Sequence, residues 1–593
     1  MEQYKNLDIV EMPLGSPYFS DMVSRFLGAN GLRMEAMDTY YAVQDADGNI
    51  IAGAGISGDI IKCVAVAQEA RSEGLMVPMI SRIVAGRGNL KVFTKPEYRE
   101  VFESLGFRLL GQAPKAILLE NGRGLEQYCA RLRAFAGNSR TGVIVMNANP
   151  FTLGHRYLIE RALEQVDHLV VIPVMEDVSM FPYKERLEMI CRGVSSIQGG
   201  DVDVVEGSPY TISAATFPTY FLKDLTEASE QQMLLDLDIF SKHIAPALGA
   251  TVRFVGSEPY DPLTARYNAL MAETLPKQGI AFVEIPRLES ISASKVRNAL
   301  AEGNYAAAAV MCPATTHPYL LAALAERALR MELDAPLKPG LVCPDSNGAH
   351  KDMDYNTMLR GIKAIRPFFP AMARATDTEA LRQLGIDAES AMLAATGGVN
   401  THRGAIFAMG LVLKSIWREL QTADTQFVVQ TRHIQMAVSD LAKLLIDSKL
   451  HLTAVGARQM ALTGYQQLFE DWLQFYRNCR SVAGQCPVSG AFTRTGLRSS
   501  AEETGHCPVA IQQLLLHIMS TLDDTCIIKR VGKERAEKVK LEISGTSPKM
   551  TECSPKMTED TLKRLCEQFA AEGISPGGAA DMVALTIFID SII

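Results

Sequence analysis

The sequence predicts a multidomain protein in which two α/β domains are followed by an all-α domain. Short apolar stretches alternate with helix-like stretches in the first half of the chain, which is typical of sheets covered by helices. Strand patterns then largely vanish, and long helical stretches dominate. The 593 residues are enough for three to five domains at roughly 100–200 residues each. We place the domains at residues 1–135, 136–312 and 313–593.

Composition and charge narrow the class of protein. The net charge of −8 gives no chain-wide basic surface for nucleic acid. The eleven cysteines contain no CxxC pair and no zinc-ligand spacing, which suits a reducing compartment. We expect neither a signal peptide nor a membrane span, because the sequence shows no leader pattern and no run of about 18 apolar residues. These features predict a cytoplasmic protein without nucleic-acid or membrane partners.

The first domain is predicted to be an α/β unit with a hairpin. Strands at 40–43 and 50–56 flank the turn 45–49, whose Asp, Gly and Asn residues suit positive φ. The further elements expected are strands at 60–67 and 90–94 and helices at 75–84 and 97–105. Residues 71–76 form a loop before a helix, where backbone amides can hold a pyrophosphate. This order resembles the GNAT acetyltransferases, which implies either coenzyme A binding or a fold kept only for docking.

The second domain is predicted to be a Rossmann-like, doubly wound α/β domain. Its expected strands are 142–147, 168–174, 202–206, 251–255 and 281–285, with helices between them. Ligands of such parallel sheets bind beyond the carboxyl ends of the strands. The first strand is followed by a turn with Asn147 and Asn149, and then by the start of a helix.

That helix start carries Thr152, Gly154 and His155. Residues 152 and 155 are three apart, so they lie on one side of a helical turn. Gly154 lets a ligand approach the backbone, and the helix N terminus attracts phosphate. His155 can then donate a hydrogen bond to the α-phosphate of a nucleoside triphosphate as charge develops there.

A second phosphate motif lies at the far end of the same domain. Ser292 and Ser294 can cap a helix and contact phosphate oxygens, while Lys295 and Arg297 supply positive charge. The two motifs in this order resemble the nucleotidylyltransferase superfamily, which implies ATP chemistry at the α-phosphate. Between them lies Lys184, which is either a basic substrate contact or part of a solvated helix face.

The stretch from Asn147 to Leu158 resembles the citrate lyase ligase family more closely. That family joins a GNAT-like domain to a nucleotidylyltransferase domain. The resemblance implies that acetate and ATP form acetyl-AMP and pyrophosphate. The acetyl group would then pass to the thiol of the prosthetic group on the citrate lyase acyl carrier subunit.

In the helical half, polar loops precede apolar helices. The candidate residues on these loops are Lys338, His350, Asp352, Asp354, Asn400, His402, Arg403, Asp523 and Asp524. The four aspartates are candidates for Mg²⁺, which prefers carboxylate and phosphate oxygens. The remaining residues are candidates for binding ATP or its phosphates. A further glycine-rich loop spans residues 575–581.

In order, these loops resemble the triphosphoribosyl-dephospho-CoA synthase family. The resemblance implies transfer of the ribosyl triphosphate of ATP to dephospho-CoA, with release of adenine. Carboxylates and Mg²⁺ can stabilise the oxocarbenium-like charge of such a step. The general base stays open between His350, His402 and Asp524. The resemblance is weak over 478–508 and over 540–560, where the tandem SPKMTE repeat suggests a surface loop.

The main hypothesis is a bifunctional maturation enzyme for citrate lyase. Within enzymes, the alternative is a plain adenylyltransferase that makes a dinucleotide. An alternative of another class is a ligase whose helical half only binds the carrier as a scaffold. Acetate-dependent pyrophosphate release and adenine release separate these three.

Overall fold

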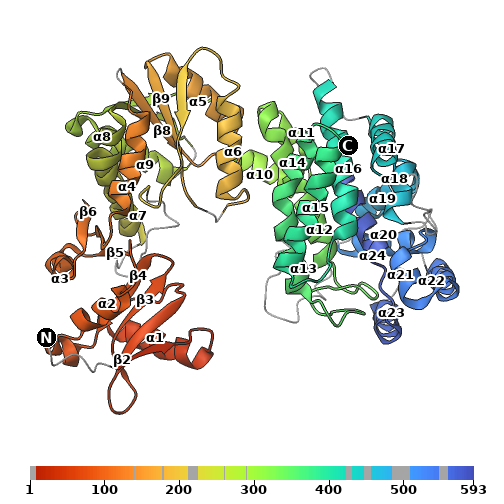
Figure 1. The fold of residues 1–593 in the computed structure, drawn as a ribbon, viewed down its shortest axis with the longest axis horizontal. Helices are drawn as coiled ribbons and strands as arrows, with labels where there is room; N and C mark the ends of the chain where they lie inside the picture. The colour runs from red at the N-terminus through yellow and green to blue at the C-terminus, as the bar shows by residue number, and fades with distance from the viewer. Residues whose placement is uncertain are drawn as a thin grey trace. The chain divides into compact units, whose positions relative to one another are not determined.

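The computed structural model describes residues 8–137, 140–176, 179–211, 225–259, 261–288, 290–422, 430–446, 456–483, 508–546 and 559–593. The chain forms two compact units (Figure 1). The first contains Met1–Asn149 and Leu153–Ser290, and the second contains Pro150–Thr152 and Ile291–Ile593. The SPKMTE repeat and most of the glycine- and serine-rich stretch before residue 508 lie outside the described residues. Within the described part, no helix is long and apolar enough to cross a membrane.

The first unit begins with a seven-stranded sheet in the order β1-β2-β3-β4-β5-β7-β6. Its strands are β1 (Ile9–Met12), β2 (Thr39–Gln44), β3 (Ile50–Ser57), β4 (Ile60–Val66), β5 (Lys91–Thr94), β6 (Arg108–Gln112) and β7 (Ile117–Glu120). Neighbours run antiparallel except β4 and β5, which are parallel and pair over only two positions. The predicted hairpin is confirmed: Asp45 Oδ1 accepts hydrogen bonds from the backbone N–H groups of Asp47 and Asn49.

The helices of this region are α1 (Pro17–Ala29), α2 (Met76–Val84), α3 (Arg99–Ser104) and α4 (Gly124–Leu132). The predicted helix at 97–105 is shorter than expected, because Pro96–Tyr98 forms a 3₁₀ turn before α3. Pro96, the first residue of that turn, has no backbone N–H and therefore cannot donate a helical hydrogen bond. The sequence prediction missed β1, β6, β7, α1 and α4.

The second sheet of this unit is entirely parallel, as predicted, with the order β10-β9-β8-β11-β12. Its strands are β8 (Thr141–Met146), β9 (His168–Pro173), β10 (Asp201–Val204), β11 (Ala250–Gly256) and β12 (Ala281–Ile285), and all five were predicted. The connecting helices include α5 (Leu153–Leu163), α6 (Tyr183–Val194), α7 (Leu225–Ile239), α8 (Ala245–Leu248) and α9 (Pro262–Thr274). The chain reverses its winding between β8 and β11, so the switch point of the sheet lies at the end of β8.

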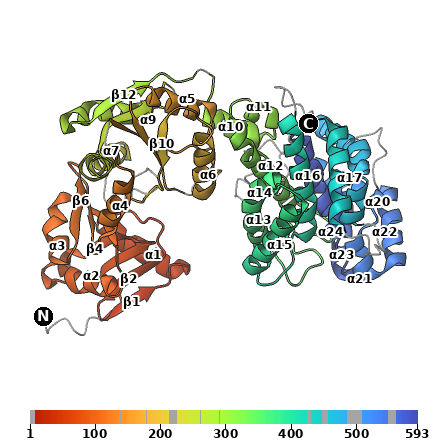
Figure 2. The same ribbon diagram turned by 45° about the horizontal axis from the view of Figure 1, so that its top comes forward.

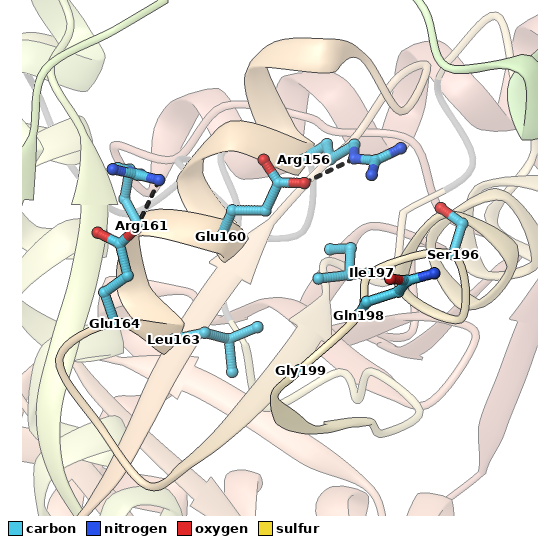
Figure 3. A pocket seen from close by; sticks show the side chains of 9 residues that line it. All are labelled: Arg156, Glu160, Arg161, Leu163, Glu164, Ser196, Ile197, Gln198 and Gly199. Carbon is cyan, nitrogen blue, oxygen red and sulfur yellow. Dashed lines mark hydrogen bonds and ion pairs between the residues drawn. The ribbon is translucent and has the colours of Figure 1, made fainter.

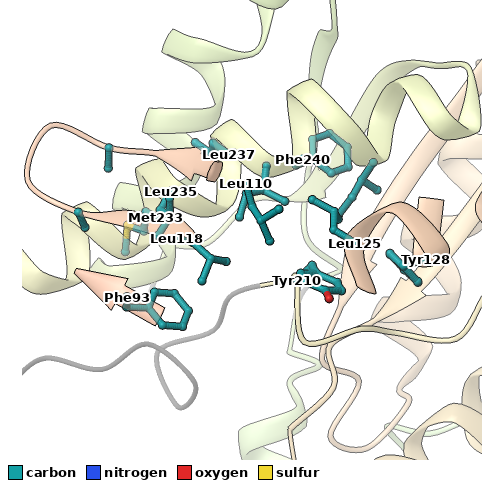
Figure 4. Close-up of a cluster of buried hydrophobic side chains, with 14 of the residues drawn as sticks. Phe93, Leu110, Leu118, Leu125, Tyr128, Tyr210, Met233, Leu235, Leu237 and Phe240 are labelled. Carbon is teal, nitrogen blue, oxygen red and sulfur yellow. The ribbon is translucent and has the colours of Figure 1, made fainter. Parts of the chain in front are cut away.

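One hydrophobic core joins the two sheets (Figure 4). Apolar side chains of the first sheet, such as Leu110 and Leu118, cluster with Leu235 and Phe240 from the second α/β region. Gly111 allows this contact, because a Cβ there would lie 2.5 Å from Cγ1 of Ile239. The two predicted α/β domains therefore pack as a single unit.

The second unit is helical, and the only strand-like pairing among its described residues is the bridge between Cys343 and Ser346. Its helices are α10 (Ala293–Ala301), α11 (Tyr305–Ala309), α12 (His317–Asp334), α13 (Tyr355–Ile365), α14 (Phe369–Arg374), α15 (Thr378–Ala395), α16 (Arg403–Thr422), α17 (Thr431–Leu445), α18 (Ala457–Leu462), α19 (Leu473–Ala483), α20 (Pro508–Thr521), α21 (Thr525–Val531), α22 (Lys533–Thr546), α23 (Glu559–Glu572) and α24 (Gly577–Asp590). Helix α24 is apolar on nearly all sides and packs against α12, α16, α19 and α20 (Figure 2). It is therefore the core helix of this unit.

Helices α10 and α11 pack with the helical unit rather than with the parallel sheet. The backbone N–H of Tyr305 donates to the carbonyl of Ser591 at 3.0 Å, and Arg327 Nε donates to the carbonyl of Ala301 at 2.9 Å. The packing boundary near residue 290 thus precedes the sequence boundary predicted at 312.

Candidate functional site

The turn after β8 is held by a fully buried arginine of α6. Arg186 is 0% exposed and donates to the carbonyls of Asn147 at 2.8 Å and Val174 at 2.9 Å. It also donates to the carbonyls of Glu176 and Phe181. Because these bonds go to backbone carbonyls on both sides of the turn, Arg186 holds the turn in place. Its neighbour Lys184 is exposed and stays a candidate for substrate contact.

The two asparagines of the turn are also engaged. Asn147 Nδ2 donates to Glu176 Oε1 at 2.8 Å, and Asn149 Oδ1 accepts from the backbone N–H of Phe181 at 3.3 Å. Ala148 between them has a φ of +48°, a strained value for a residue with a Cβ. The turn is therefore rigid, and its backbone lies at the switch point of the sheet.

His155 lies in the first turn of α5, beyond the end of β8. Its side chain is only partly accessible, and burial together with the positive charge of Arg287 lowers its pKa to about 4. At neutral pH the imidazole is neutral and can donate one hydrogen bond. Arg287 follows β12, donates to Glu258 Oε2 at 2.7 Å, and was missed by the sequence prediction. Its position after a strand of the parallel sheet was the available signal.

The second phosphate motif opens α10 in the helical unit. Ser292 caps this helix, as predicted, and accepts from the backbone N–H of Lys295 at 3.1 Å. Ser294 Oγ accepts from Arg297 at 3.1 Å, and Ser294 and Lys295 are exposed. Burial lowers the pKa of Arg297, which stays charged. The motif therefore presents two cations at the N terminus of a helix, where anions bind well.

Thr152 is 2% exposed and lies just before α5, while Gly154 lies within its first turn. By packing, Thr152 groups with the helical unit and His155 with the α/β unit. Each motif lies at the start of a helix, α5 or α10, where backbone N–H groups can meet a phosphate. That the two motifs act on one ATP is an inference from the sequence.

A groove of about 540 Å³ lies along the later turns of α5 (Figure 3). Arg156 and Arg161 line it but are paired with Glu160 at 2.8 Å and Glu164 at 2.5 Å. Its other wall includes Gly199, at the amino ends of the strands, whereas His155 lies at the carboxyl ends. The groove is therefore not the site predicted from the motifs.

In the helical unit, the predicted loops meet around buried charges. Lys338 is 2% exposed, and its Nζ donates to Glu332 Oε1 at 2.6 Å. His402 is 5% exposed, and burial and the charge of Lys338 lower its pKa to about 4. Asp524 is buried, accepts from the backbone N–H groups of Cys526 and Ala579, and has a raised pKa because of burial.

Two glycines bring the loops this close together. A Cβ on Gly404 would lie 1.9 Å from Asp581 Oδ2, and a Cβ on Gly578 would lie 3.0 Å from Asp524 Oδ1. Burial and the charges of Glu332 and Asp524 raise the pKa of Asp581 well above its usual range. Glu332 and Asp581 were not among the predicted site residues.

His350 lies in a more accessible part of the same unit. Its Nε2 is 2.8 Å from Ser575 Oγ, and its Nδ1 is 3.3 Å from Arg530 and 3.6 Å from Asp352. Burial lowers the pKa of His350, with Arg530 as the second cause. The predicted loops 347–354 and 575–581 are thus brought together.

The other predicted residues of this half have structural partners. Asp354 caps α13 by accepting from Thr357 N at 2.7 Å, and Asn400 accepts from Arg403 N at 3.1 Å at the start of α16. Arg403 is paired with Glu389.

The four aspartates proposed for Mg²⁺ do not form one cluster. Asp523 is paired with Lys540 at 2.8 Å, Asp524 caps α21, and Asp352 is 64% exposed. In the described ranges, no group of three or more His, Cys, Asp or Glu residues could hold a metal. A Mg²⁺ ion that is held mainly by phosphates needs only one or two carboxylates, which Asp352 could supply.

The fold and site define a two-part protein. Its first part has the parallel sheet and helix N terminus of α/β domains that handle nucleotides, and its second part encloses a separate polar centre. The family model for the citrate lyase ligase C-terminal domain matches residues 141–320. The model for ATP:dephospho-CoA triphosphoribosyl transferase matches residues 318–593. The chain therefore belongs to the citrate lyase ligase family in its first half and to the triphosphoribosyl-dephospho-CoA synthase family in its second.

Similar proteins support both assignments. The citrate (pro-3S)-lyase ligase of Haemophilus influenzae is 43% identical over 317 residues, covering 50% of this chain and 94% of that protein. The citrate (pro-3S)-lyase ligase of Escherichia coli is 40% identical over 316 residues, covering 50% of this chain and 89% of that protein. The probable 2-(5''-triphosphoribosyl)-3'-dephosphocoenzyme-A synthase of Stutzerimonas stutzeri is 32% identical over 291 residues. The match covers 46% of this chain and 90% of that protein. The chain thus joins a ligase and a transferase.

Among solved structures, Thermotoga maritima TmcAL bound with alpha-thio ATP aligns at 14% identity with a TM-score of 0.21. The alignment covers 55% of this chain and 98% of the TmcAL chain. A likeness this low supports no argument about the site.

Proposed function

We propose that this chain carries out two steps in the maturation of citrate lyase. The helical half makes 2'-(5''-triphosphoribosyl)-3'-dephospho-CoA from ATP and dephospho-CoA and releases adenine. The α/β half acetylates the thiol of the prosthetic group on the acyl carrier subunit. The observation that carries the proposal is the presence of both families on one chain, meeting at residues 318–320.

In the ligase reaction, acetate attacks the α-phosphate of ATP, and pyrophosphate leaves. Neutral His155 donates a hydrogen bond to the α-phosphate as negative charge grows there. Thr152 and Gly154 let the phosphate approach the N terminus of α5, next to the rigid turn of Asn147 and Asn149. The carrier thiol then attacks the carbonyl of acetyl-AMP, and AMP leaves.

The second phosphate motif is assigned to ATP from the order of the two motifs in the sequence. Ser292, Ser294, Lys295 and Arg297 bind the β- and γ-phosphates, which become the leaving pyrophosphate. The support for this assignment is the exposed, cationic helix start of α10 together with the family match. Exposed Lys184 is the proposed contact to acetate or the carrier arm.

The first sheet is proposed to be a GNAT-like domain that receives the pantetheine arm of the carrier. The parallel strands β4 and β5 pair over only two positions, Ile60 with Lys91 and Ile61 with Val92. Gly74 with φ +68° precedes α2, and the backbone amides there can meet a pyrophosphate. The sheet is either a docking site alone or a participant in the transfer.

In the synthase reaction, the triphosphate of ATP is proposed to lie near His350, Arg530 and Arg403. Mg²⁺ would accompany the phosphates, with Asp352 as a ligand, and it would supply charge neutralisation. The residues of this chain orient the ribose and exclude water. We expect both reactions in the cytoplasm, because the described cysteines are all free and both reactions use ATP.

Two assays on the full chain test the proposal. With ATP, acetate and deacetylated carrier, AMP and pyrophosphate release should require both acetate and carrier at steady state. Pyrophosphate release without acetate would instead indicate a plain adenylyltransferase. With ATP and dephospho-CoA, adenine should be released. Absence of adenine above an enzyme-free background would indicate that the helical half is a scaffold.

A further inference from the structure

The residue that precedes helix α12 makes a hydrogen bond to the turn of the first phosphate motif. Thr316 Oγ1 donates to the backbone carbonyl of Phe151 at 2.9 Å. Both residues are 0% exposed, so the bond is shielded from water. Phe151 belongs to the short segment Pro150–Thr152, which packs with the helical unit. The bond therefore joins two segments of one compact unit that are 165 positions apart in the sequence.

Thr316 does not use its hydroxyl in the way that is usual for its position. It is the N-cap residue of α12, where a threonine oxygen normally accepts from a backbone N–H of the first helical turn. The Thr316 side chain makes no such capping bond, and its hydroxyl is turned toward Phe151. Because this arrangement forgoes the local stabilisation of a cap, the contact with Phe151 is the interaction that the hydroxyl provides.

The bonded carbonyl fixes the orientation of a whole peptide unit. The carbonyl of Phe151 and the N–H of Thr152 belong to the same peptide unit, which is planar. A donor on the carbonyl therefore fixes the direction in which the N–H of Thr152 points. Helix α5 begins at the next residue, Leu153, and His155 lies two residues further along. The backbone N–H groups at such a helix start are the ones that can meet a phosphate.

Helix α12 also holds the helix that carries the second phosphate motif. Arg327 Nε of α12 donates to the carbonyl of Ala301, the last residue of α10, at 2.9 Å. The His317 ring at the start of α12 lies 3.2 Å from the Tyr305 hydroxyl of α11. Helices α10 and α11 accordingly pack against α12 (Figure 2). One helix therefore holds segments of both phosphate motifs.

We propose that Thr316 is a positioning residue for the ligase reaction, which fixes the Phe151–Thr152 peptide so that the start of α5 can meet the α-phosphate of ATP. Helix α12 thereby sets this peptide relative to the second phosphate motif on α10. Thr316 acts through the backbone and takes no part in the chemistry. It lies within residues 141–320, the part of the chain that matches the ligase family. The proposal rests on the proposed ligase function.

The simpler alternative is that Thr316 only stabilises the fold around the start of α12. Because α12 packs against the core helix α24, a purely structural loss should lower both activities together. A positioning role predicts instead a loss that is confined to the ligase reaction and that depends on His155. These two expectations can be separated by experiment.

The first test compares Thr316→Val with Thr316→Ser in the full chain. Valine keeps the shape of the side chain without the hydroxyl, whereas serine keeps the hydroxyl. We expect kcat for acetate-dependent pyrophosphate release to fall by about 10-fold in Thr316→Val, while adenine release stays within about twofold of wild type. Thr316→Ser should retain most of the ligase activity. Equal losses of both activities, or wild-type ligase activity in Thr316→Val, would overturn the proposal.

The matched control is Thr586→Val. The Thr586 hydroxyl is equally buried and also donates to a backbone carbonyl, that of Met582, within α24 of the same unit. This variant should leave acetate-dependent turnover unchanged, because Thr586 has no bond to either phosphate motif among the described residues. A ligase loss equal to that of Thr316→Val would show a general effect of removing a buried hydroxyl and would refute the positioning role.

The second test is a double-mutant cycle with His155→Ala. If Thr316 acts through the helix start that carries His155, Thr316→Val should cost less than about threefold in kcat once His155 is absent. An undiminished loss of about 10-fold in the His155→Ala background would reveal an independent effect and contradict the proposal.

A third measurement does not depend on activity. Hydrogen exchange of the backbone amides of residues 151–156 should be about 10-fold faster in Thr316→Val than in wild type or Thr316→Ser. Unchanged exchange would overturn the proposal whatever the activities are. If the wild-type chain shows no acetate-dependent pyrophosphate release, the ligase function fails, and the exchange rates still decide whether Thr316 fixes this peptide.

Discussion

At the scale of single residues, burial sets the protonation states of two candidate site histidines. His155 and His402 each have a pKa lowered to about 4, mainly by burial and secondly by a nearby cation, Arg287 or Lys338. Both imidazoles are therefore neutral at neutral pH and act as hydrogen-bond donors or acceptors, not as cations. The sequence identified both histidines, but it could not identify the cations beside them.

Replacing His155 with alanine should slow the ligase reaction. Loss of a positioned donor at the α-phosphate typically lowers the rate by roughly 10²–10⁴-fold, and we expect acetate-dependent pyrophosphate release to fall by this factor. Adenine release should not change. His433→Ala, at a half-exposed histidine paired with Glu419, is the matched control. Near wild-type turnover of His155→Ala would exclude His155 from the mechanism.

His402 should make the stability of the helical unit depend on pH. Its pKa is about 4 in the fold against 6.5 ordinarily, so the unfolded chain binds more protons between these values. Stability from neutral His402 is complete above pH 6.5 and is lost as the pH falls toward 4. We expect a loss on the order of 2–3 kcal/mol between pH 7 and 4.5 in urea unfolding, absent from His402→Gln. An equal loss in His402→Gln would refute the assignment of this pH dependence to His402. His433→Gln is the control.

At the scale of elements, turns and helix starts carry the predicted site residues, and buried side chains such as Arg186 hold the turns in place. Arg186 supports the turn after β8 through backbone carbonyls, and Ser292, Asp354 and Asp524 cap α10, α13 and α21. Sequence patterns predicted the strands and caps well, because these depend on local residue types. They could not show that Arg186 is a clamp, because this depends on what surrounds the side chain.

Arg186→Met should disrupt the turn after β8. Each buried carbonyl left without a donor costs roughly 1–3 kcal/mol, so we expect the α/β unit to lose about 3 kcal/mol or more of unfolding free energy. Acetate-dependent turnover should fall with it, while adenine release persists. Arg192→Met, at an exposed position of the same helix that pairs with Glu188, should change stability little. An Arg186→Met protein with normal stability would contradict the clamp.

Gly404→Ala should separate the starts of α16 and α24. The new Cβ would lie 1.9 Å from Asp581 Oδ2, so Asp581 must move. We expect adenine release to fall by about 10-fold or more, because the loops before α16 and α24 carry candidate site residues and a shift of about 1 Å at a site has a large effect. Gly385→Ala in α15, where the Cβ meets nothing within 4 Å, should be neutral or stabilising by up to about 1 kcal/mol. Equal activities of the two variants would count against the close approach.

At the scale of the whole molecule, packing and sequence divide the chain at different places. The family models meet at 318–320, but α10 and α11 pack with the helical unit from residue 291. The seven-stranded sheet and the parallel sheet, which the sequence assigns to two domains, share one hydrophobic core. The predicted phosphate motif at residues 292–297 thus lies on a helix that packs with the helical unit.

A fragment that begins at residue 291 should therefore be more stable than one that begins at 313. The shorter fragment loses the contacts of Tyr305 with Ser591 and His317 and of Arg327 with Ala301. We expect its thermal midpoint to be several degrees lower, as a loss of about 1–2 kcal/mol implies, and adenine release to be retained best by the longer fragment. Equal midpoints would show that α10 and α11 do not stabilise the helical unit.

The sequence by itself determined the strands of the parallel sheet, the helical class of the second half and both enzyme families, and it predicts the two phosphate motifs. These follow from local patterns of apolar residues, turn formers and caps, which do not depend on distant parts of the chain. Only the tertiary structure decided the neutral state of His155, the clamp role of Arg186, the packing of α10 and the close approach of Gly404 to Asp581. Burial and charge at these positions arise from residues far apart in the sequence, so no local pattern could encode them.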